Sequence, residues 1–202
     1  MLEIRFHGRG GQGTVVATTL LAKAFFSAGY YVQSFPLFGV ERRGAPLESY
    51  VRVAPGQIVV RTNVYQPNHV VVMDRTLLHA VDVTQGLRAG GWVLINAPAA
   101  PAGVERFSGF NVAIVDATRI ALRRELGTRT HPIVNTAMMG AFANMLGMPP
   151  MDAIATAIEE EIPDKSEKNI LAARDAYEAV NLIGLIGGDS NPKSQQGLPL
   201  QA

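Results

Sequence analysis

Residues 1–30 read MLEIRFHGRGGQGTVVATTLLAKAFFSAGY, and their pattern indicates how the chain begins to fold. Ile4 and Phe6 alternate with charged residues, which indicates a strand at the amino terminus. A cluster of glycines follows at positions 8–13. Beyond it, apolar residues recur every three to four positions as far as Ala28, the spacing of a helix with one buried face. The stretch therefore predicts a strand, a tight glycine turn and a helix.

The glycine turn is a candidate anion site. Gly8, Gly10 and Gly13 fit the pattern G-x-G-x-x-G in the strand-to-helix setting that gives the pattern its meaning. Glycine allows positive φ and the close approach of a ligand, and the free N–H groups at the start of a helix suit a phosphate. The alternative is a turn that only packs the helix onto its strand.

The residues after the turn narrow the choice of ligand. A site for NAD needs a carboxylate about twenty residues after the glycines, and residues 31–36 contain none. A P-loop needs a lysine directly after the last glycine, and Thr14 stands there instead. The pattern therefore favours neither NAD nor phosphoryl transfer from ATP.

A second candidate anion site is the loop at residues 36–46, which is rich in proline and glycine and carries Arg42 and Arg43. The planar guanidinium of arginine suits phosphate or carboxylate, and loops at the carboxyl ends of parallel strands are where open α/β sheets bind ligands. The alternative is that both arginines pair with Glu41 and Glu48 or lie in water.

Composition sets outer limits on function. The chain has 202 residues, 48% of them hydrophobic, and 18 basic against 17 acidic residues, so its net charge of +1 argues against binding nucleic acid or an anionic membrane. It has no cysteine, which excludes disulfides and cysteine-ligated iron–sulfur clusters within this chain. Without a secretion signal or a membrane-length apolar run, a cytoplasmic protein is expected.

The rest of the chain predicts alternating strands and helices up to about residue 115 and helices after it. We expect one α/β domain over residues 1–183, a Rossmann-like three-layer sandwich with a mostly parallel sheet, an inserted β-hairpin and a helical carboxyl-terminal part. Residues 184–202 are expected to be a tail, flexible or bound by a partner. The expected hairpin pairs 47–53 with 57–61, further strands are expected at 68–74, 92–96 and 111–115, and helices are expected at 76–88, 120–126, 135–146, 151–161 and 164–180.

Two of these elements carry specific expectations. Asp74 ends an apolar strand, and capping the helix at 76–88 is favoured over a role in ligand binding. The methionine-rich helix at 135–146 is apolar on most sides, so it is expected to be buried all round or covered on one side by another subunit.

No reaction centre is predicted from the residues. The four histidines, His7, His69, His79 and His131, include no pair spaced as metal ligands on one helix face. No nucleophile-elbow sequence occurs and no carboxylate pair is singled out by its spacing. We therefore predict no catalytic and no metal-binding residue, which fits one component of a larger enzyme.

Three motifs give the chain a family resemblance. FHGRGGQG at 6–13, FPLFGVERRGAP at 35–46 and Asn169 within EKNI at 167–170 closely resemble the gamma subunit of pyruvate and related 2-oxoacid:ferredoxin (acceptor) oxidoreductases, over roughly residues 1–182. The resemblance implies a multisubunit enzyme that oxidatively decarboxylates a 2-oxoacid to acyl-CoA and CO₂. It implies that thiamine diphosphate, Mg and Fe–S clusters lie on partner subunits: thiamine-binding alpha and beta type subunits and a ferredoxin-like Fe–S subunit.

For this chain the resemblance implies coenzyme A binding and a role in subunit assembly, without catalysis by the chain alone. The form RGAP at 43–46 resembles the pyruvate or branched-chain 2-oxoacid type. Two other hypotheses stay open: a freestanding Rossmann oxidoreductase that binds NADP through Arg42 or Arg43, and a purely structural assembly module. The resemblance implies that the following residues bind the cofactor: Gly8, Arg9, Gly10, Gly11, Gln12, Gly13, Thr14, Arg42 and Arg43. The two arginines are expected to face either a phosphate or a neighbouring subunit.

Overall fold

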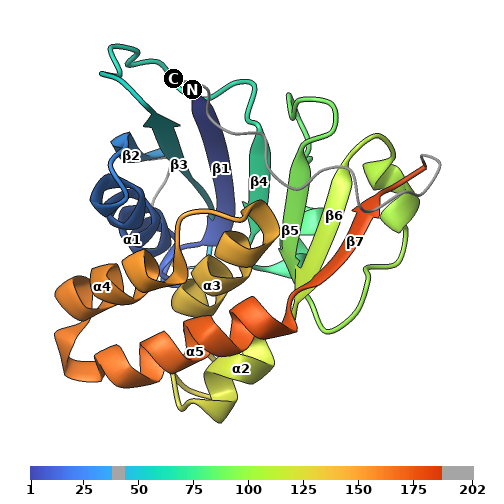
Figure 1. Cartoon of the computed structure of the whole chain (residues 1–202). Helices are drawn as coiled ribbons and strands as arrows, with labels where there is room; N and C mark the ends of the chain where they lie inside the picture. Colours follow the sequence, from blue (N-terminus) through green and yellow to red (C-terminus); the bar gives the residue numbers. More distant parts are fainter. Residues whose placement is uncertain (38–43, 188–202) are drawn as a thin grey trace.

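The computed structural model describes residues 1–37 and 44–187, which form a seven-stranded sheet with helices (Figure 1). The strands follow the order β2-β3-β1-β4-β5-β6-β7 across the sheet. The strands are β1 (Leu2–Arg9), β2 (Tyr31–Leu37), β3 (Pro46–Ala54), β4 (His69–Val72), β5 (Trp92–Asn96), β6 (Asn111–Val115) and β7 (Asn181–Leu185). The helices are α1 (Thr14–Ser27), α2 (Ala117–Arg123), α3 (Asn135–Leu146), α4 (Met151–Glu161) and α5 (Ser166–Ala179), with 3₁₀ turns η1 (Arg75–His79), η2 (Val104–Phe107) and η3 (Pro163–Lys165).

The strand that carries the glycine turn, β1, lies in the middle of the sheet. It runs parallel to β4, and β4, β5 and β6 continue in parallel. On its other side β1 is antiparallel to β3, which is in turn antiparallel to β2. The predicted α/β class with a mostly parallel sheet is therefore confirmed, with antiparallel strands toward its edges.

The two faces of the sheet are covered differently. Ile4 and Phe6 of β1 point toward the α-helices, and all five helices contribute side chains to this larger core. The α-helices lie together on the near face of the sheet in Figure 1. Val70 and Val72 of β4 point to the other face, where 3₁₀ turns and loops, including Leu77 and Phe107, form the second core. The alternation of residues along each strand fills both cores.

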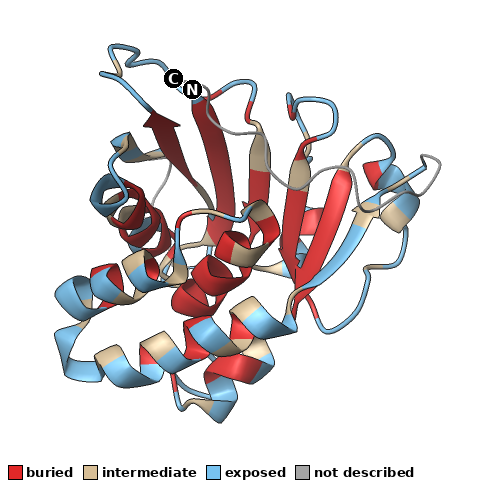
Figure 2. Cartoon of the chain, in the orientation of Figure 1, coloured by how far each residue is buried: buried red, intermediate tan, exposed pale blue. Residues whose placement is uncertain are grey.

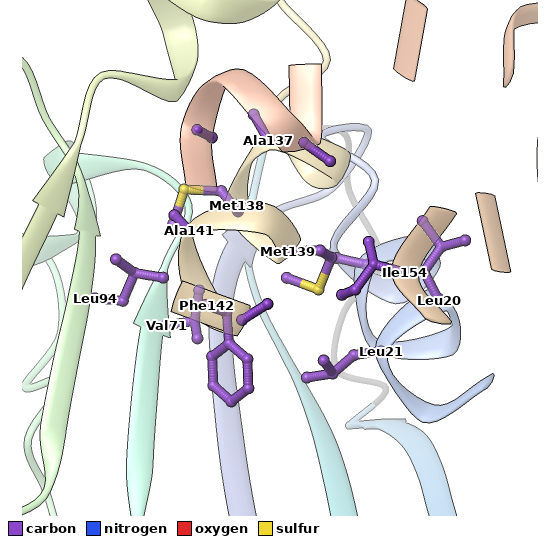
Figure 3. Close-up of a cluster of buried hydrophobic side chains, with 14 of the residues drawn as sticks. Leu20, Leu21, Val71, Leu94, Ala137, Met138, Met139, Ala141, Phe142 and Ile154 are labelled. Atoms are coloured by element: carbon purple, nitrogen blue, oxygen red, sulfur yellow. The ribbon is translucent and has the colours of Figure 1, made fainter. Parts of the chain in front are cut away.

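Helix α3 is the centre of the larger core. Met138, Met139 and Phe142 are fully buried in the larger core; in Figure 3, Met139 lies near Ile154 of α4 and Leu20 of α1, and Phe142 lies near Val71 of β4. Figure 2 shows α3 almost entirely in the colour of buried residues, whereas α4 and α5 expose their outer sides. Of the two expectations for this methionine-rich helix, burial within its own chain is the correct one.

The predicted hairpin at 47–53 and 57–61 is wrong. Both edges of β3 are already paired, with β1 and with β2, so residues 57–61 form no strand. The segment that follows β3 is held by a side chain instead: the guanidinium of Arg52 donates to the backbone oxygens of Val60, Thr62 and Asn63. Arg52 is 1% exposed, and its Nε also donates to Glu3 Oε1 at 2.8 Å.

Two further predictions need correction. The helix expected at 76–88 is only the 3₁₀ turn η1 followed by turns, because the side chain of Asp82 accepts from the N–H of Thr84 and turns the chain there. The carboxyl-terminal part is not wholly helical, since β7 pairs antiparallel with β6. The other predicted strands and helices are confirmed within a few residues. Residues 188–202, most of the expected tail, lie outside the described residues.

Candidate functional site

The glycine turn lies at the carboxyl edge of the sheet, where two connections diverge. From β1 the chain passes through α1 to β2 on one side, and from the neighbouring parallel strand β4 it passes to β5 on the other side. Such a switch point in an open α/β sheet leaves a crevice at the carboxyl ends of the strands, which is where these folds bind ligands. The predicted turn therefore lies at the position where a ligand is expected.

Asp74, just after β4, holds the turn in shape. Its Oδ2 accepts from Arg9 Nε at 3.1 Å and from Gln12 Nε2 at 2.9 Å. Arg9 also donates to the backbone oxygen of Gly44 and to Thr76 Oγ1, and Gln12 Oε1 accepts from the backbone N–H of Arg9. The side chains of Arg9 and Gln12, both predicted to bind the cofactor, are thus used within the protein.

Asp74 is also a cap, as the sequence predicted, although of a 3₁₀ turn. Its Oδ1 accepts from the N–H of Thr76 at 2.9 Å. Burial opposes ionisation of this carboxyl, but hydrogen bonds from Thr76 and Gln12 and the charge of Arg9 outweigh it, so the pKa of Asp74 lies below its usual value. Asp74 is therefore a fixed negative charge that locks the turn.

The start of α1 presents unpaired backbone donors. Gly13 is the N-cap residue with φ of 75°, no side chain caps the helix, and its first turn contains no acidic residue. The first helical N–H with a partner belongs to Ala17, which donates to Gly13 O at 2.9 Å. Within residues 1–37 and 44–187, the N–H groups of Gly11 and of residues 13–16 find no acceptor. These donors carry the positive end of the helix dipole and attract an anion.

At two positions of the turn, close contacts leave no room for a residue larger than glycine. A Cβ on Gly8 would lie 1.9 Å from Oγ1 of Thr14, so the strand and the helix can approach only without it. That hydroxyl is buried and makes no hydrogen bond. A Cβ on Gly13 would lie 2.8 Å from Nδ2 of Asn135, the first residue of α3. The packing alternative for these glycines is thus real, and it coexists with the free donors of α1.

The turn also contacts the residues that follow the arginine loop. Gly10 N–H donates to Ala45 O and Gly44 N–H donates to Gly10 O, both at 3.0 Å. Arg42 and Arg43 themselves lie outside the described residues. The contacts nevertheless join the turn to Gly44, the residue directly after Arg43 in the chain.

A cavity of about 350 Å³ opens beside the turn, next to the carboxyl end of β1. His7, at its polar end, is 3% exposed, and its Nδ1 lies 3.5 Å from Oε1 of Glu48. Burial is the main reason that the pKa of His7 is lowered to about 4; Glu48 opposes this shift and Arg5 adds to it. His7 is therefore neutral at pH 7. The cavity is lined by His7, Gly8, Leu37, Pro46, Leu47, Glu48, Leu77 and Val81.

The described part of the chain shows no group of three or more histidine, aspartate or glutamate residues that could hold a metal ion. No helix in the described ranges is long and apolar enough to cross a bilayer.

Sequence reasoning missed Asn135 as a residue of this site. Its neighbour Thr136 donates from Oγ1 to Oδ1 of Asn169, and Asn169 donates to Lys165 O, both at 2.9 Å. Asn169, which belongs to one of the motifs of the family resemblance, thus braces the start of α3. A polar residue that opens an otherwise apolar helix was the available signal for Asn135.

Similar proteins of known identity cover nearly the whole chain. It is 47% identical to the common subunit gamma of the pyruvate/ketoisovalerate oxidoreductases of Pyrococcus furiosus, with 92% of this chain and 100% of that subunit covered. It is similar to the crystal structure of the pyruvate oxidoreductase subunit PORC from Thermotoga maritima, with a TM-score of 0.75, 38% identity, and 89% and 97% of the two chains covered. A fold likeness, at 16% identity and a TM-score of 0.65, links it to the 2-oxoglutarate:ferredoxin oxidoreductase of Magnetococcus marinus, solved with 2-oxoglutarate, coenzyme A and succinyl-CoA bound; 88% of this chain matches 30% of that one.

The chain is an α/β protein whose glycine turn presents free N–H donors at the switch point of its sheet. The family model for pyruvate ferredoxin/flavodoxin oxidoreductase matches residues 3–179. The chain belongs to this family, as a gamma subunit of a pyruvate or related 2-oxoacid oxidoreductase. The resemblance found in the sequence motifs is therefore confirmed, and a freestanding NADP-dependent oxidoreductase is not favoured.

Proposed function

We propose that this gamma subunit binds coenzyme A through the glycine turn, for a reaction whose centre lies on partner subunits. The reaction converts a 2-oxoacid and the thiol of CoA into an acyl thioester, CO₂, a proton and two electrons that leave to an acceptor. CoA carries a pyrophosphate and a 3′-phosphate, which suit a helix N-terminus. The observation that carries the proposal is the group of unpaired N–H donors at the start of α1.

Several features around these donors support CoA as the ligand. The backbone of Gly8, Gly11, Gly13 and Thr14 is proposed to approach a phosphate, and the side chains of Arg9 and Gln12 to keep the turn in shape. The cavity that borders Gly8 is mostly apolar, so it suits an uncharged part of coenzyme A, although none of the unpaired N–H donors lines it. The Magnetococcus marinus enzyme, which shares the fold, was solved with coenzyme A bound. Gly10 is proposed to hold the turn, and Arg42 and Arg43 to contact a phosphate or the neighbouring subunit.

The remaining cofactors are assigned to other chains. Thiamine diphosphate, Mg and Fe–S clusters are proposed to lie on thiamine-binding alpha and beta type subunits and a ferredoxin-like Fe–S subunit. The absence of cysteine from all 202 residues supports this division, because the thiolate ligands of a cluster must then come from a partner. Pyruvate or a branched-chain 2-oxoacid is the proposed substrate class, in line with the RGAP segment at 43–46.

The test places a charge in the first turn of α1 within the reconstituted complex. Val15 is 37% exposed, and Val15→Glu adds a carboxylate that favours the helix by about 0.3–1 kcal/mol while repelling a bound phosphate. We expect KM for CoA to rise about tenfold or more, with KM for the 2-oxoacid unchanged. Val15→Gln, similar in size and uncharged, is the matched control and keeps KM for CoA close to that of the unaltered complex.

The outcomes separate the hypotheses. If KM for CoA is the same in Val15→Glu and Val15→Gln, the turn does not bind CoA and the chain serves assembly alone. Tight binding of NADPH by the isolated chain would instead revive the hypothesis of a freestanding Rossmann oxidoreductase.

A further inference from the structure

Two helices begin side by side at the glycine turn. Helix α1 starts after Gly13, and α3 starts at Asn135, whose Nδ2 lies 2.8 Å from the position of a Cβ on Gly13. Neither helix has a side-chain cap from its N-cap residue, and neither has an acidic residue in its first turn. The positive ends of two helix dipoles therefore meet at one place, without a negative side chain from either first turn between them.

Only one end of the Asn135 side-chain amide makes a hydrogen bond in the described part of the chain. Its Oδ1 accepts from the N–H of Thr136 at 2.8 Å, which also fixes which end of the amide is nitrogen. Its Nδ2 donates to nothing in the described part of the chain, although the residue is only 3% exposed. This nitrogen is not among the unpaired atoms that are sealed from solvent, whereas Oγ1 of Thr14 is. A buried side chain thus keeps two N–H donors reachable and aims them at the start of α1.

A purely structural role does not explain this arrangement. The bond from Thr136 N–H to Oδ1 would be made equally well by an aspartate, which would also interact favourably with the dipole of α3. A structural role therefore predicts that aspartate is tolerated at this position or is even stabilising. Asparagine differs from aspartate in presenting a neutral donor pair, which only an acceptor at the turn would use.

We infer that Asn135 is a specificity-determining residue of the turn, whose amide donates to the same phosphate as the N–H groups of α1. This inference rests on the proposed function. Donors that reach an anion from two helices match the several oxygens of a tetrahedral phosphate better than the two coplanar oxygens of a carboxylate. The site therefore selects the phosphate-bearing end of coenzyme A and rejects carboxylate compounds such as the 2-oxoacid substrate.

The experiment replaces Asn135 with aspartate in the reconstituted complex. Asn135→Asp keeps the size and the bond to Thr136, and we expect KM for CoA to rise about tenfold or more, because a donor is lost and the new carboxylate repels the phosphate. The melting temperature of the subunit and KM for the 2-oxoacid stay unchanged. The matched control is Asn144→Asp, the same change near the other end of α3, which leaves KM for CoA unchanged.

A second variant and a second ligand keep the inference falsifiable. Asn135→Ser retains an acceptor near Thr136 but is too short to reach the turn, so it also raises KM for CoA. Inorganic pyrophosphate, used as a competitive inhibitor against CoA, loses potency in parallel in both variants. Because Asn135→Ser adds no charge, a KM for CoA within about twofold of the unaltered complex in this variant overturns the inference, whatever the effect of Asn135→Asp. The proposed function still stands in that case if Val15→Glu raises KM for CoA, and it falls as well if Val15→Glu has no effect.

Discussion

The contact between α3 and α5 allows a sharp prediction about stability. Gly140 lies in the middle of α3, where a Cβ would be 1.8 Å from the backbone oxygen of Ala173 and 2.5 Å from its carbonyl carbon. Real Cβ atoms essentially never come closer than 3.0 Å to another heavy atom, so Gly140→Ala requires the helices to separate by at least 1.2 Å, the difference between 3.0 and 1.8 Å. The clashing atoms of Ala173 belong to the backbone, so no side-chain rotation can relieve the clash.

The size of the effect follows from this separation. Gly140 faces Ala173, which is fully buried on α5 together with Ala172 and Ala176, so the loss of contact is spread over a close-packed surface. A gap of about 1 Å removes a quarter to a half of each dispersion contact. Overpacking typically costs about 1–3 kcal/mol and occasionally more, and a clash with fixed backbone lies at the upper end, at about 3 kcal/mol or slightly above. Alanine in a helix recovers about 1 kcal/mol relative to glycine. We expect a net loss of about 2–3 kcal/mol, or roughly 4–12 °C in Tm for a domain of this size.

Urea unfolding measures this loss with two independent signals. Far-UV circular dichroism follows the helices, and the fluorescence of Trp92, the single tryptophan, follows the sheet. Gly56→Ala is the matched control, because nothing lies within 4 Å of a Cβ there, and its unfolding free energy stays within about 1 kcal/mol of the unaltered chain. A Gly140→Ala variant as stable as the unaltered protein, or more stable, would show that α3 and α5 do not pack this closely at Gly140.

Three further predictions concern the turn and its surroundings. Gly8→Ala destabilises the chain by about 1–3 kcal/mol, because the new Cβ clashes with Thr14 Oγ1. Thr14→Ala in the same chain partly relieves this clash. A double-mutant cycle in which the two free-energy changes are simply additive therefore counts against the contact. Asp74→Ala removes the acceptor for Arg9, Gln12 and Thr76 and lowers the unfolding free energy by about 2 kcal/mol. Asp82→Ala leaves only Thr84 without its acceptor and lowers the unfolding free energy by less. Equal losses for the two variants in urea titrations contradict this ranking. Desolvation lowers the pKa values of the buried His7 and the partly exposed His69 to about 4, below the ordinary 6.5. The unfolded chain therefore binds more protons between these values, and stability is lost as pH falls from about 6.5 to 4, by up to about 3 kcal/mol per histidine. A urea midpoint that stays constant over this range contradicts the lowered pKa values.

Local pattern was sufficient for most elements of the fold. The change of period at Gly13 correctly predicted β1, the turn and α1, because each is determined by residues close together in sequence. The hairpin prediction failed for the opposite reason: β3 pairs with strands that precede it by up to fifty residues, and alternation does not reveal a partner. The helix expected at 76–88 failed because Asp82 turns the chain through its side chain, a competition that apolar spacing does not show.

The elements that form the candidate site were predicted from the sequence, but the contacts between them were not. The glycines and the free helix start were visible as a pattern, and the structure brings them to the switch point of the sheet. The internal roles of Arg9 and Gln12 depend on Asp74, some sixty residues further on, and the approach of Asn135 to Gly13 depends on how α1 and α3 pack. Such tertiary contacts have no local signature.

The central position of β1 has a consequence for how the protein is made. Leu2–Arg9 pairs with β3 on one edge and with β4 on the other, and the last of these partners is Val72. The amino-terminal strand therefore leaves the ribosome long before either neighbour exists, and the glycine turn gains its contacts with Asp74 only after residues beyond 72 have emerged. A fragment that ends after α1 would keep all the glycines of the turn but would lack the strands and side chains that hold the turn in its folded shape.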